Sequence, residues 1–331
     1  MVAKLMMKIF SLDQSQDLSC AIAERLGLEL SPLEVRKFAD GEYKVRPLVS
    51  VSGEEVSVIA TFIQEGDLGV HDKLCLSLFL AGALKDAHAR DINLITPYLC
   101  YARKDQRTKS RDPLTLRYVA SLLEAAGYTG IAAMDVHNAS AFESAFRVPV
   151  EHLSARELLA ARLAEIAKKE PVTLITPDFG GAKRVYGVRG YFNKLRGIDD
   201  TKFGLVIKER SLGEVKGGPF LGDVKGRVAI IFDDLISSGD TVLRAAHNCL
   251  ELGASKVLIA ATHIVLSEET VSRLSDNAID YVVATNTTLS QHKLPLSLAA
   301  KLELLDVSRI FAKTRESYHR GDVQMESPIL A

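Results

Sequence analysis

The sequence has few cysteines, and this scarcity narrows the kind of site it can encode. Its 331 residues include four cysteines, and none of them forms a CxxC pair of the kind that binds zinc or carries dithiol chemistry. They lie in apolar helix- or strand-like segments, so we expect mostly buried, reduced thiols. The four residues are Cys20, Cys75, Cys100 and Cys249.

Long apolar runs are missing as well. No segment approaches the about 18 uninterrupted apolar residues that a membrane-spanning helix needs. The N-terminal apolar stretch is interrupted at Lys8 and lacks a small-residue cleavage site, unlike a secretory signal. We therefore expect a cytoplasmic protein with no membrane partner.

Neither sign of charge is in excess. The 41 Lys and Arg residues nearly balance the 42 Asp and Glu residues, for a formal net charge of -1. A nucleic-acid partner is not expected, because the overall charge does not attract a polyanion. Any site for an anionic ligand must be local.

What the sequence does contain is a repeated alternation of two patterns. Short runs rich in Val and Ile, such as VSVIATFI and RVAIIFDD, alternate with stretches whose apolar residues recur every three or four positions. This alternation is typical of βαβ units, in which helices cover both faces of a mostly parallel sheet. The length and the 47% apolar content suffice for two such α/β domains. We expect their boundary near Pro149–Glu170, at a charged, Ala-rich helix.

Two segments are predicted to be long loops. Cys100–Pro113 is crowded with Arg, Lys and Asp, and Ser211–Gly226 holds five glycines and a proline. Loops of this length inside compact domains are often functional.

The stretch Ile230–Val242, IIFDDLISSGDTV, carries the most specific chemistry. If residues 227–232 form a strand, Asp233 and Asp234 follow its carboxyl end, where ligands bind in open parallel sheets. The next five residues supply backbone N–H groups at a helix start, which can cradle a phosphate. Ordinary turn and N-cap residues would look much the same, so the segment alone leaves both readings open. The five are Ser237, Ser238, Gly239, Asp240 and Thr241.

This stretch resembles the phosphoribosyl pyrophosphate motif shared by type I phosphoribosyltransferases and ribose-phosphate pyrophosphokinases. Six further segments, in the same order, resemble the pyrophosphokinases. They are FADGEYKVRP (38–47), PYLCYARKDQR (97–107), SRDPLT (110–115), MDVHNAS (134–140), TPDFGGAKR (176–184) and IKERS (207–211). The chain is identified by this resemblance as a member of the pyrophosphokinase family.

The resemblance implies two tandem phosphoribosyltransferase-like domains, residues 1–155 and 156–310, and a tail, 311–331, that packs back on the N-terminal domain. It implies transfer of the β,γ-diphosphoryl group of ATP to the C1 hydroxyl of ribose 5-phosphate, giving phosphoribosyl pyrophosphate and AMP. It also implies a Mg²⁺ cofactor and a homo-oligomer built from dimers, a tetramer or a hexamer, because the family's ATP segment and catalytic loop meet across a subunit interface.

Site residues are carried over position by position. Lys208 and Arg210 match the catalytic segment, and His137 and Asp178 match metal-linked positions. The ATP positions are Phe38, Asp40, Gly41, Glu42, Arg103 and Lys104. The ribose 5-phosphate positions are Asp233, Asp234 and the five residues Ser237, Ser238, Gly239, Asp240 and Thr241.

Taken alone, several of these residues could equally have an ordinary structural role. A histidine after a strand is more often structural, Asp178 beside two glycines fits a turn, and Phe38 fits a core. An exposed Lys-Glu-Arg triplet is normally a solvated strand end. Asp240 departs from the family, which usually has a small residue there, and a carboxylate beside a phosphate costs affinity unless it points outward or caps the helix.

Two rival functions follow from the shared motif. A simple phosphoribosyltransferase would have one core domain and no ATP segment. A catalytically silent partner subunit would be expected to lose the reactive lysine, whereas Lys208 is present.

Overall fold

The computed structural model describes residues 7–13, 17–211, 214–290, 292 and 294–320, with the side chains at 207–219 and 315–320 left out. Within these residues the chain divides into two compact units. Unit 1 holds residues 7–154 and 306–320, and unit 2 holds residues 155–305. The chain therefore leaves unit 1, forms unit 2, and returns.

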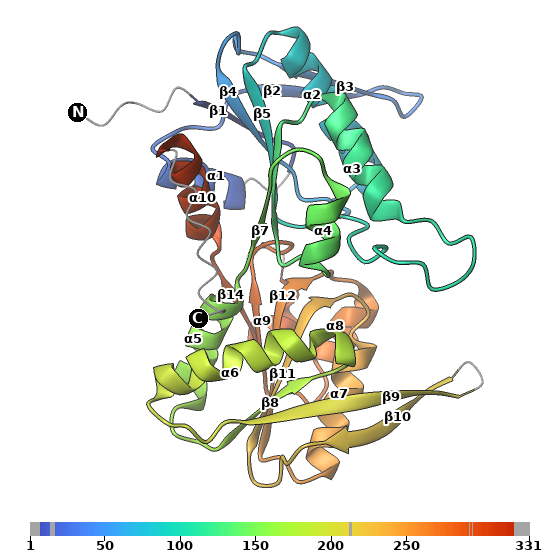
Figure 1. The fold of residues 1–331 in the computed structure, drawn as a ribbon, viewed down its shortest axis with the longest axis vertical. Coiled ribbons are helices and arrows are strands. Elements are labelled where there is room, and N and C mark those ends of the chain that lie inside the picture. Colours follow the sequence, from blue (N-terminus) through green and yellow to red (C-terminus); the bar gives the residue numbers. More distant parts are fainter. Residues whose placement is uncertain (1–6, 14–16, 212–213, 291, 293, 321–331) are drawn as a thin grey trace. The chain divides into compact units, whose positions relative to one another are not determined.

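Unit 1 is built on a five-stranded parallel sheet in the order β1-β4-β5-β6-β7 (Figure 1). Strands β4 and β6 are buried along their whole length, which explains their continuous apolar sequence. The strands are β1 (Met7–Ser11), β4 (Glu55–Ile59), β5 (Asp91–Thr96), β6 (Gly130–Met134) and β7 (Val150–Leu153).

Helices cover both faces of this sheet. Helices α2 and α3 pack together on one side, and α1 packs with α10 on the other (Figure 1). The helices are α1 (Asp17–Arg25), α2 (Val70–Asp86), α3 (Thr115–Ala126), α4 (Ala139–Ala145) and α10 (Ser308–Arg320).

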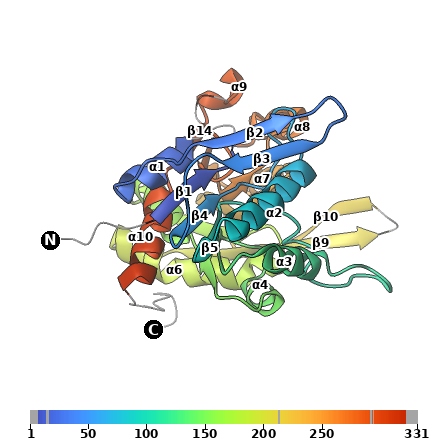
Figure 2. The ribbon, with the colours of Figure 1, turned by 90° about the horizontal axis from the view of Figure 1, so that it is seen from above.

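A separate antiparallel hairpin belongs to unit 1. Its strands are β2 (Leu33–Lys37) and β3 (Tyr43–Pro47), and β3 packs against α2 (Figure 2). The turn between the two strands, residues 38–42, lies away from the main sheet (Figure 2).

The chain that returns to unit 1 is held there by an ion pair and a hydrogen bond. Arg25 Nη2 lies 2.9 Å from Asp306 Oδ2, and Arg25 Nε donates to Ser308 Oγ at 2.5 Å. The return thus begins before the predicted tail start at residue 311.

Unit 2 is built on a seven-stranded sheet in the order β10-β9-β8-β11-β12-β13-β14, parallel except for the β9–β10 pair. Its strands are β8 (Val172–Thr176), β9 (Lys202–Ser211), β10 (Glu214–Leu221), β11 (Val228–Ile236), β12 (Lys256–Ile264), β13 (Tyr281–Thr285) and β14 (Leu302–Leu305). Its helices are α5 (Arg156–Ala167), η1 (Phe179–Gly181), α6 (Ala182–Arg196), α7 (Asp240–Glu251), α8 (Glu268–Leu274) and α9 (Leu296–Ala299).

The central strand β11 shows why the apolar run in this unit is continuous. Ile230 joins the core formed with α5 and α6, whereas Ile231 joins the core formed with α7. Successive strand residues point to opposite faces of a sheet, so a strand buried on both faces needs apolar residues at every position. The run ends where the polar residues of the site begin.

The expectation of a long loop over Ser211–Gly226 is wrong for most of that segment. Residues 214–221 form β10, which pairs antiparallel with β9, and the two strands extend as an arm from the sheet (Figures 1 and 2). The register shifts between Gly217 and Phe220, around Pro219, which cannot donate to the ladder. Glycine is also required at Gly204 on β9, because a Cβ there would lie 2.6 Å from the Phe220 ring. These glycines and the proline shape an edge hairpin rather than a loop.

The expected burial of the thiols holds for two of the four. Cys100 and Cys249 are buried, Cys20 is partly exposed, and Cys75 is exposed on the outer side of α2. The apolar neighbours of Cys75 in sequence face inward, whereas its own helical position faces out. Within the described residues, none of the helices has the length and apolar character needed to cross a bilayer.

Candidate active site

Two acidic residues lie near the carboxyl end of β11 in unit 2. Pairing between β11 and β8 ends at Ile231 and Ile175, so Asp233 and Asp234 extend beyond the end of β8. They belong to the strand itself, which is longer than the predicted 227–232. Asp234 is buried and accepts from Arg184 Nη2 at 3.1 Å, while Asp233 is half-buried. Parallel strands deliver both carboxylates to the edge where ligands bind in such sheets.

The charge balance at this edge is acidic. Burial raises the pKa of the Asp233 carboxyl well above its ordinary value of 3.8, and the neighbouring carboxylates of Asp234 and Asp178 raise that pKa further. A backbone hydrogen bond from the Asp234 N–H to Asp233 Oδ1, 2.9 Å long, offsets part of this effect. Carboxylates arranged in this way are suited to accepting hydrogen bonds from hydroxyl groups or to facing a cation.

The next five residues form a tight turn into helix α7. Gly239 has φ +85°, the left-handed region that favours glycine, and it is the N-cap of the helix. The Asp240 N–H lies 3.5 Å from Ser238 Oγ. The first N–H groups of a helix have no preceding turn to donate to, so the start of α7 presents donors and a positive dipole end. This geometry is the one that binds phosphate at helix N-termini.

Asp240 is the residue of this turn that departs from the family pattern. Its carboxylate forms an ion pair with Arg273 of α8, with Asp240 Oδ1 2.9 Å from Arg273 Nη2. Arg273 Nη1 also donates to the Ser238 carbonyl at 2.8 Å. The negative charge of Asp240 is therefore matched by a cation on a neighbouring helix. Nothing in the spacing of the sequence points to Arg273, and its role was missed.

Lys208 and Arg210 lie within strand β9 rather than at its end. Lys208 is opposite Gly217 of β10, and Arg210 is opposite Val215. Their side chains lie outside what the structure describes, so their roles remain a prediction.

The predicted adenine segment is the turn of the β2–β3 hairpin in unit 1. Phe38 is 38% exposed, which excludes the reading of a core residue. The Arg36 guanidinium lies 5.1 Å from its ring centroid. Gly41 has φ +93°, and Asp40 Oδ1 accepts from the Glu42 N–H at 3.1 Å. The turn thus presents an aromatic face and two exposed carboxylates, Asp40 and Glu42, to solvent.

Arg103 and Lys104 are exposed on the loop that follows β5. This loop is held in place by backbone bonds from Lys104 N–H to the Tyr101 carbonyl and from Leu116 N–H to the Lys104 carbonyl. Tyr101 also stacks on His71 of α2, with its hydroxyl 3.1 Å from His71 Nδ1. Sequence reasoning did not identify the His71–Tyr101 contact.

The turn that holds His137 is tied to the same loop. His137 is exposed, and the adjacent Asn138 donates from Nδ2 to Asp105 Oδ2 at 2.9 Å while its Oδ1 caps α4. This hydrogen bond links the turn of His137, predicted to bind metal, to the loop that carries Arg103 and Lys104, predicted to bind ATP phosphates. Asp178 belongs to unit 2, where its Oδ1 accepts from the Gly181 N–H at 3.2 Å and caps η1.

The described residues contain no group of three or more His, Cys, Asp or Glu side chains placed to hold a metal ion. A closed protein cage for a metal is thus not seen within the described part of the chain. The predicted ligands are one carboxylate and one imidazole, and Mg²⁺ commonly binds through one or two protein groups, several waters and substrate phosphates. The donor chemistry fits that kind of ion.

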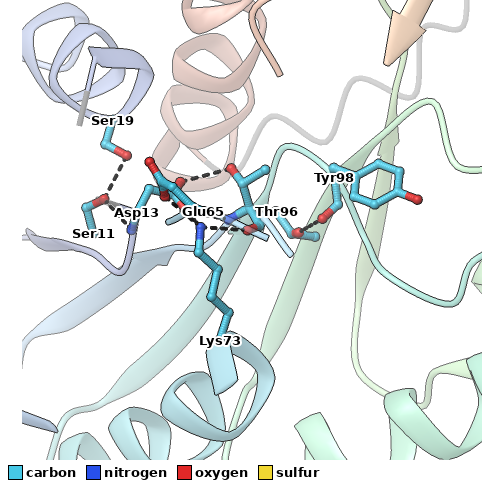
Figure 3. A network of polar contacts seen from close by, with 8 residues as sticks. Ser11, Asp13, Ser19, Glu65, Lys73, Thr96 and Tyr98 are labelled. Carbon is cyan, nitrogen blue, oxygen red and sulfur yellow. Dashed lines mark hydrogen bonds and ion pairs between the residues drawn. The ribbon is translucent and has the colours of Figure 1, made fainter. Parts of the chain in front are cut away.

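Unit 1 has its own polar cluster at the corresponding edge of its sheet (Figure 3). Lys73 of α2 is 0% exposed, and its Nζ lies 3.0 Å from Asp13 Oδ1 and 2.8 Å from Glu65 Oε2. Its ammonium also donates to the Thr61 carbonyl at 3.1 Å, while the Thr61 N–H and hydroxyl donate to Asp13. Burial raises the pKa of Asp13, and the Lys73 charge opposes that rise.

Comparisons with known proteins agree with this architecture. The model for the N-terminal domain of ribose phosphate pyrophosphokinase matches residues 7–127, and the model for the phosphoribosyl synthetase-associated domain matches residues 214–326. Phosphoribosylpyrophosphate synthetase from Mycobacterium smegmatis is similar with a TM-score of 0.84 and 29% identity, covering 95% of this chain and 99% of that chain.

Two phosphoribosyltransferases match more weakly. A hypoxanthine-guanine phosphoribosyltransferase from Bacillus anthracis has a TM-score of 0.31 and 14% identity, covering 42% of this chain and 84% of that chain. A purine phosphoribosyltransferase from Pyrococcus horikoshii has a TM-score of 0.28 and 18% identity, covering 45% of this chain and 78% of that chain.

The fold places the chain in the phosphoribosyltransferase-like class, with two such domains in tandem. Within that class the two family models together span more than half of the sequence, and the chain belongs to the ribose phosphate pyrophosphokinase family. It is a ribose-phosphate diphosphokinase, which transfers the diphosphoryl group of ATP to the C1 hydroxyl of ribose 5-phosphate for nucleotide biosynthesis. The fold class and the activity implied by the sequence motifs are confirmed, and the rival functions are set aside.

Proposed function

We propose that the two units divide the work of this diphosphoryl transfer. Unit 2 binds ribose 5-phosphate at the end of β11, with Asp233 and Asp234 accepting hydrogen bonds from the ribose hydroxyls. The turn Ser237–Thr241 binds the 5-phosphate through backbone N–H groups and hydroxyls. The observation that carries this proposal is the acidic pair placed directly before a glycine turn and a helix start.

Unit 1 supplies the ATP contacts in the same proposal. The exposed Phe38 ring stacks on adenine, and the exposed Asp40 and Glu42 carboxylates, with the Gly41 turn between them, accept from its amino group and ribose hydroxyls. Arg103 and Lys104 contact the phosphates, for which the planar fork of arginine is especially suited.

The transferring group needs positive charge as it moves. Phosphoryl transfer depends mainly on positioning and on neutralising charge at the phosphate oxygens, and Lys208 and Arg210 provide that charge in this proposal. His137 of unit 1 and Asp178 of unit 2 would each offer a donor to Mg²⁺, whose charge would neutralise the ATP phosphates.

Self-association into a homo-oligomer is also proposed. Three large apolar side chains, Phe79 of α2 and Tyr118 and Leu122 of α3, are about half exposed on two helices that pack against each other. Exposed apolar clusters of this kind are typical of protein interfaces. Tyr118→Glu should lower the molar mass measured by light scattering. Leu296→Glu, at an exposed position of unit 2, serves as the control that leaves the mass unchanged.

The central experiment is an assay of AMP release from ATP, with and without ribose 5-phosphate and Mg²⁺. Release should require both, and adding EDTA should stop it until Mg²⁺ is restored. Lys208→Ala should lower turnover by orders of magnitude with an unchanged circular dichroism spectrum. Lys216→Ala, on the paired strand β10, is the matched control. Equal losses in both variants, or no loss at Lys208, would remove the catalytic assignment. The cytoplasmic location stays a prediction, which cell fractionation would test.

A further inference from the structure

Helix α8 supports the phosphate turn from one side. Arg273 of this helix contacts the turn at two points, the Ser238 carbonyl at 2.8 Å and the Asp240 carboxylate at 2.9 Å. Thr270, one helical turn earlier, donates from Oγ1 to the Ser237 carbonyl at 2.5 Å. Two consecutive carbonyls of the turn are therefore fixed toward α8.

Fixing these carbonyls also fixes the N–H groups that follow them. In a planar trans peptide the C=O and the next N–H point in opposite directions. With the Ser237 and Ser238 carbonyls bonded to α8, the N–H groups of Ser238 and Gly239 face away from α8. These are the N–H groups expected to meet an anion at the start of α7.

The fit between Arg273 and the turn is close. A Cβ at Gly239 would lie 3.2 Å from the Arg273 Cβ, so the glycine allows the arginine stem to pass directly beside the turn. The side chain of Arg273 is 22% exposed, which holds its guanidinium in a partly desolvated position. Charge interactions in such positions are stronger than between fully exposed groups.

Arg273 also balances charge. Asp240 places a carboxylate at the first position of α7, where an incoming phosphate would meet it, and like charges repel. The guanidinium neutralises Asp240, although it is shared with Glu269, whose Oε1 lies 2.6 Å from Arg273 Nη2. Two carboxylates thus compete for one cation beside the turn.

We propose that Arg273 is a positioning residue for ribose 5-phosphate, which orients the amides of the phosphate turn and cancels the charge of Asp240. The inference rests on the proposed ribose 5-phosphate site in unit 2. The Asp240–Arg273 pair sets the affinity for the sugar phosphate, and neither member acts on ATP.

The test measures KM for each substrate separately in four proteins: the wild type, Arg273→Ala, Asp240→Asn, and the double variant. Arg273→Ala should raise KM for ribose 5-phosphate by about 10- to 100-fold, the size expected when hydrogen bonds and a charge partner are lost. KM for ATP should change less than twofold. Asp240→Asn alone should lower KM for ribose 5-phosphate, because it removes a like charge.

The double variant distinguishes two roles of Arg273: neutralising the charge of Asp240 and holding the backbone of the turn in place. It should recover part of the loss seen in Arg273→Ala, since no uncompensated carboxylate remains. Arg273→Lys should fall between the wild type and Arg273→Ala, because lysine keeps the charge and loses the fork. Equal rises in both KM values, or a double variant no better than Arg273→Ala at equal melting temperature, would overturn the inference. Failure of the proposed function looks different, as AMP release by the wild type would then be independent of ribose 5-phosphate.

Discussion

The carboxyl-end edges of the two sheets start from the same geometry and differ in how their negative charge is balanced. In unit 1, Asp13 and Glu65 surround the wholly buried ammonium of Lys73. In unit 2, Asp233 and Asp234 lie beside Asp178, and the cation bonded to Asp234 is the partly exposed Arg184. The first edge carries its own counterion at its centre, whereas the second keeps an acidic surplus next to a turn of backbone amides.

This difference separates a structural edge from a binding edge. A buried cation among carboxylates joins α2 to the ends of β1 and β4, and it leaves little charge to attract a ligand. A carboxyl whose pKa is raised by burial and by neighbouring carboxylates, as at Asp233, lowers stability at neutral pH, and such groups are common where a ligand is to be bound. The same sheet position thus serves cohesion in unit 1 and recognition in unit 2.

The largest expected effect concerns the sheet edge of unit 1, where Lys73 neutralises the carboxylates. Lys73→Met leaves the buried Asp13 and the partly buried Glu65 without their cation and should lower the free energy of unfolding by about 3–5 kcal/mol. Lys85→Met, at an exposed position of the same helix, is the control and should cost little. Arg184→Met at the edge of unit 2 should cost less, about 1–3 kcal/mol, because Arg184 is 22% exposed whereas Lys73 is wholly buried. Urea denaturation measures all three. Similar losses for Lys73 and Arg184 would break the comparison.

The second prediction concerns the sheet edge of unit 2, which carries Asp233 and Asp234. Asp234→Asn should lower kcat/KM for ribose 5-phosphate by about 10- to 100-fold, because a neutral amide accepts weaker hydrogen bonds from ribose hydroxyls than a carboxylate does. Steady-state kinetics with ribose 5-phosphate varied at saturating ATP measures this effect. The melting temperature should fall no further than in Arg184→Met, which breaks the same ion pair. A loss of activity that follows a loss of stability would contradict the assignment.

The third prediction is a pH dependence with a defined sign. The pKa of Asp233 is raised above 3.8 in the folded protein, so between these two values the folded state holds more protons than the unfolded chain. The contribution of Asp233 to stability is therefore present below pH 3.8 and is lost as the pH rises through its folded pKa. Unfolding free energies of the wild type and Asp233→Asn, measured across that range, should diverge in favour of the variant as the pH rises. Parallel curves would contradict the raised pKa.

The smallest expected effect concerns the reactivity of the cysteine thiols. Each unit has one buried cysteine. Burial raises the pKa of Cys100 in unit 1 and of Cys249 in unit 2 to about 12. Both should resist an alkylating reagent at neutral pH, because the thiolate is the reactive form. Exposed Cys75 should react first, as seen by mass spectrometry of peptides from the native protein. Early labelling of Cys249 would show that unit 2 opens more readily than its packing indicates.

The parts of the fold that depend on local pattern were predictable from the sequence. The run RVAIIFDD predicted a strand of a sheet covered on both faces, with acidic residues at its carboxyl end, and β11 is buried on both faces, although it continues past Asp233 and Asp234 to Ile236. The small residues after it predicted a turn into a helix, and Gly239 adopts the left-handed conformation there. Both features are set by residues adjacent in sequence.

The missed features depend on partners far apart in the chain. Arg273 contacts Asp240 from a different helix, and Lys73 meets Asp13 across sixty positions of sequence. Neither residue has a local signature, since a lysine or arginine on a helix is normally a solvated side chain. Strand β10 was missed for another reason: its glycines and proline are typical of loops, although an edge hairpin tolerates them.

The return of the chain at Asp306 has a consequence for biosynthesis. Helix α1 precedes unit 2 in the sequence, whereas its partner α10 and the Asp306 and Ser308 contacts of Arg25 follow unit 2. Within the described residues unit 2 is one continuous segment, and it is synthesised before them. Domains generally fold as units during synthesis, the N-terminal one first. Here unit 1 cannot complete the packing of α1 with α10 until unit 2 has been synthesised.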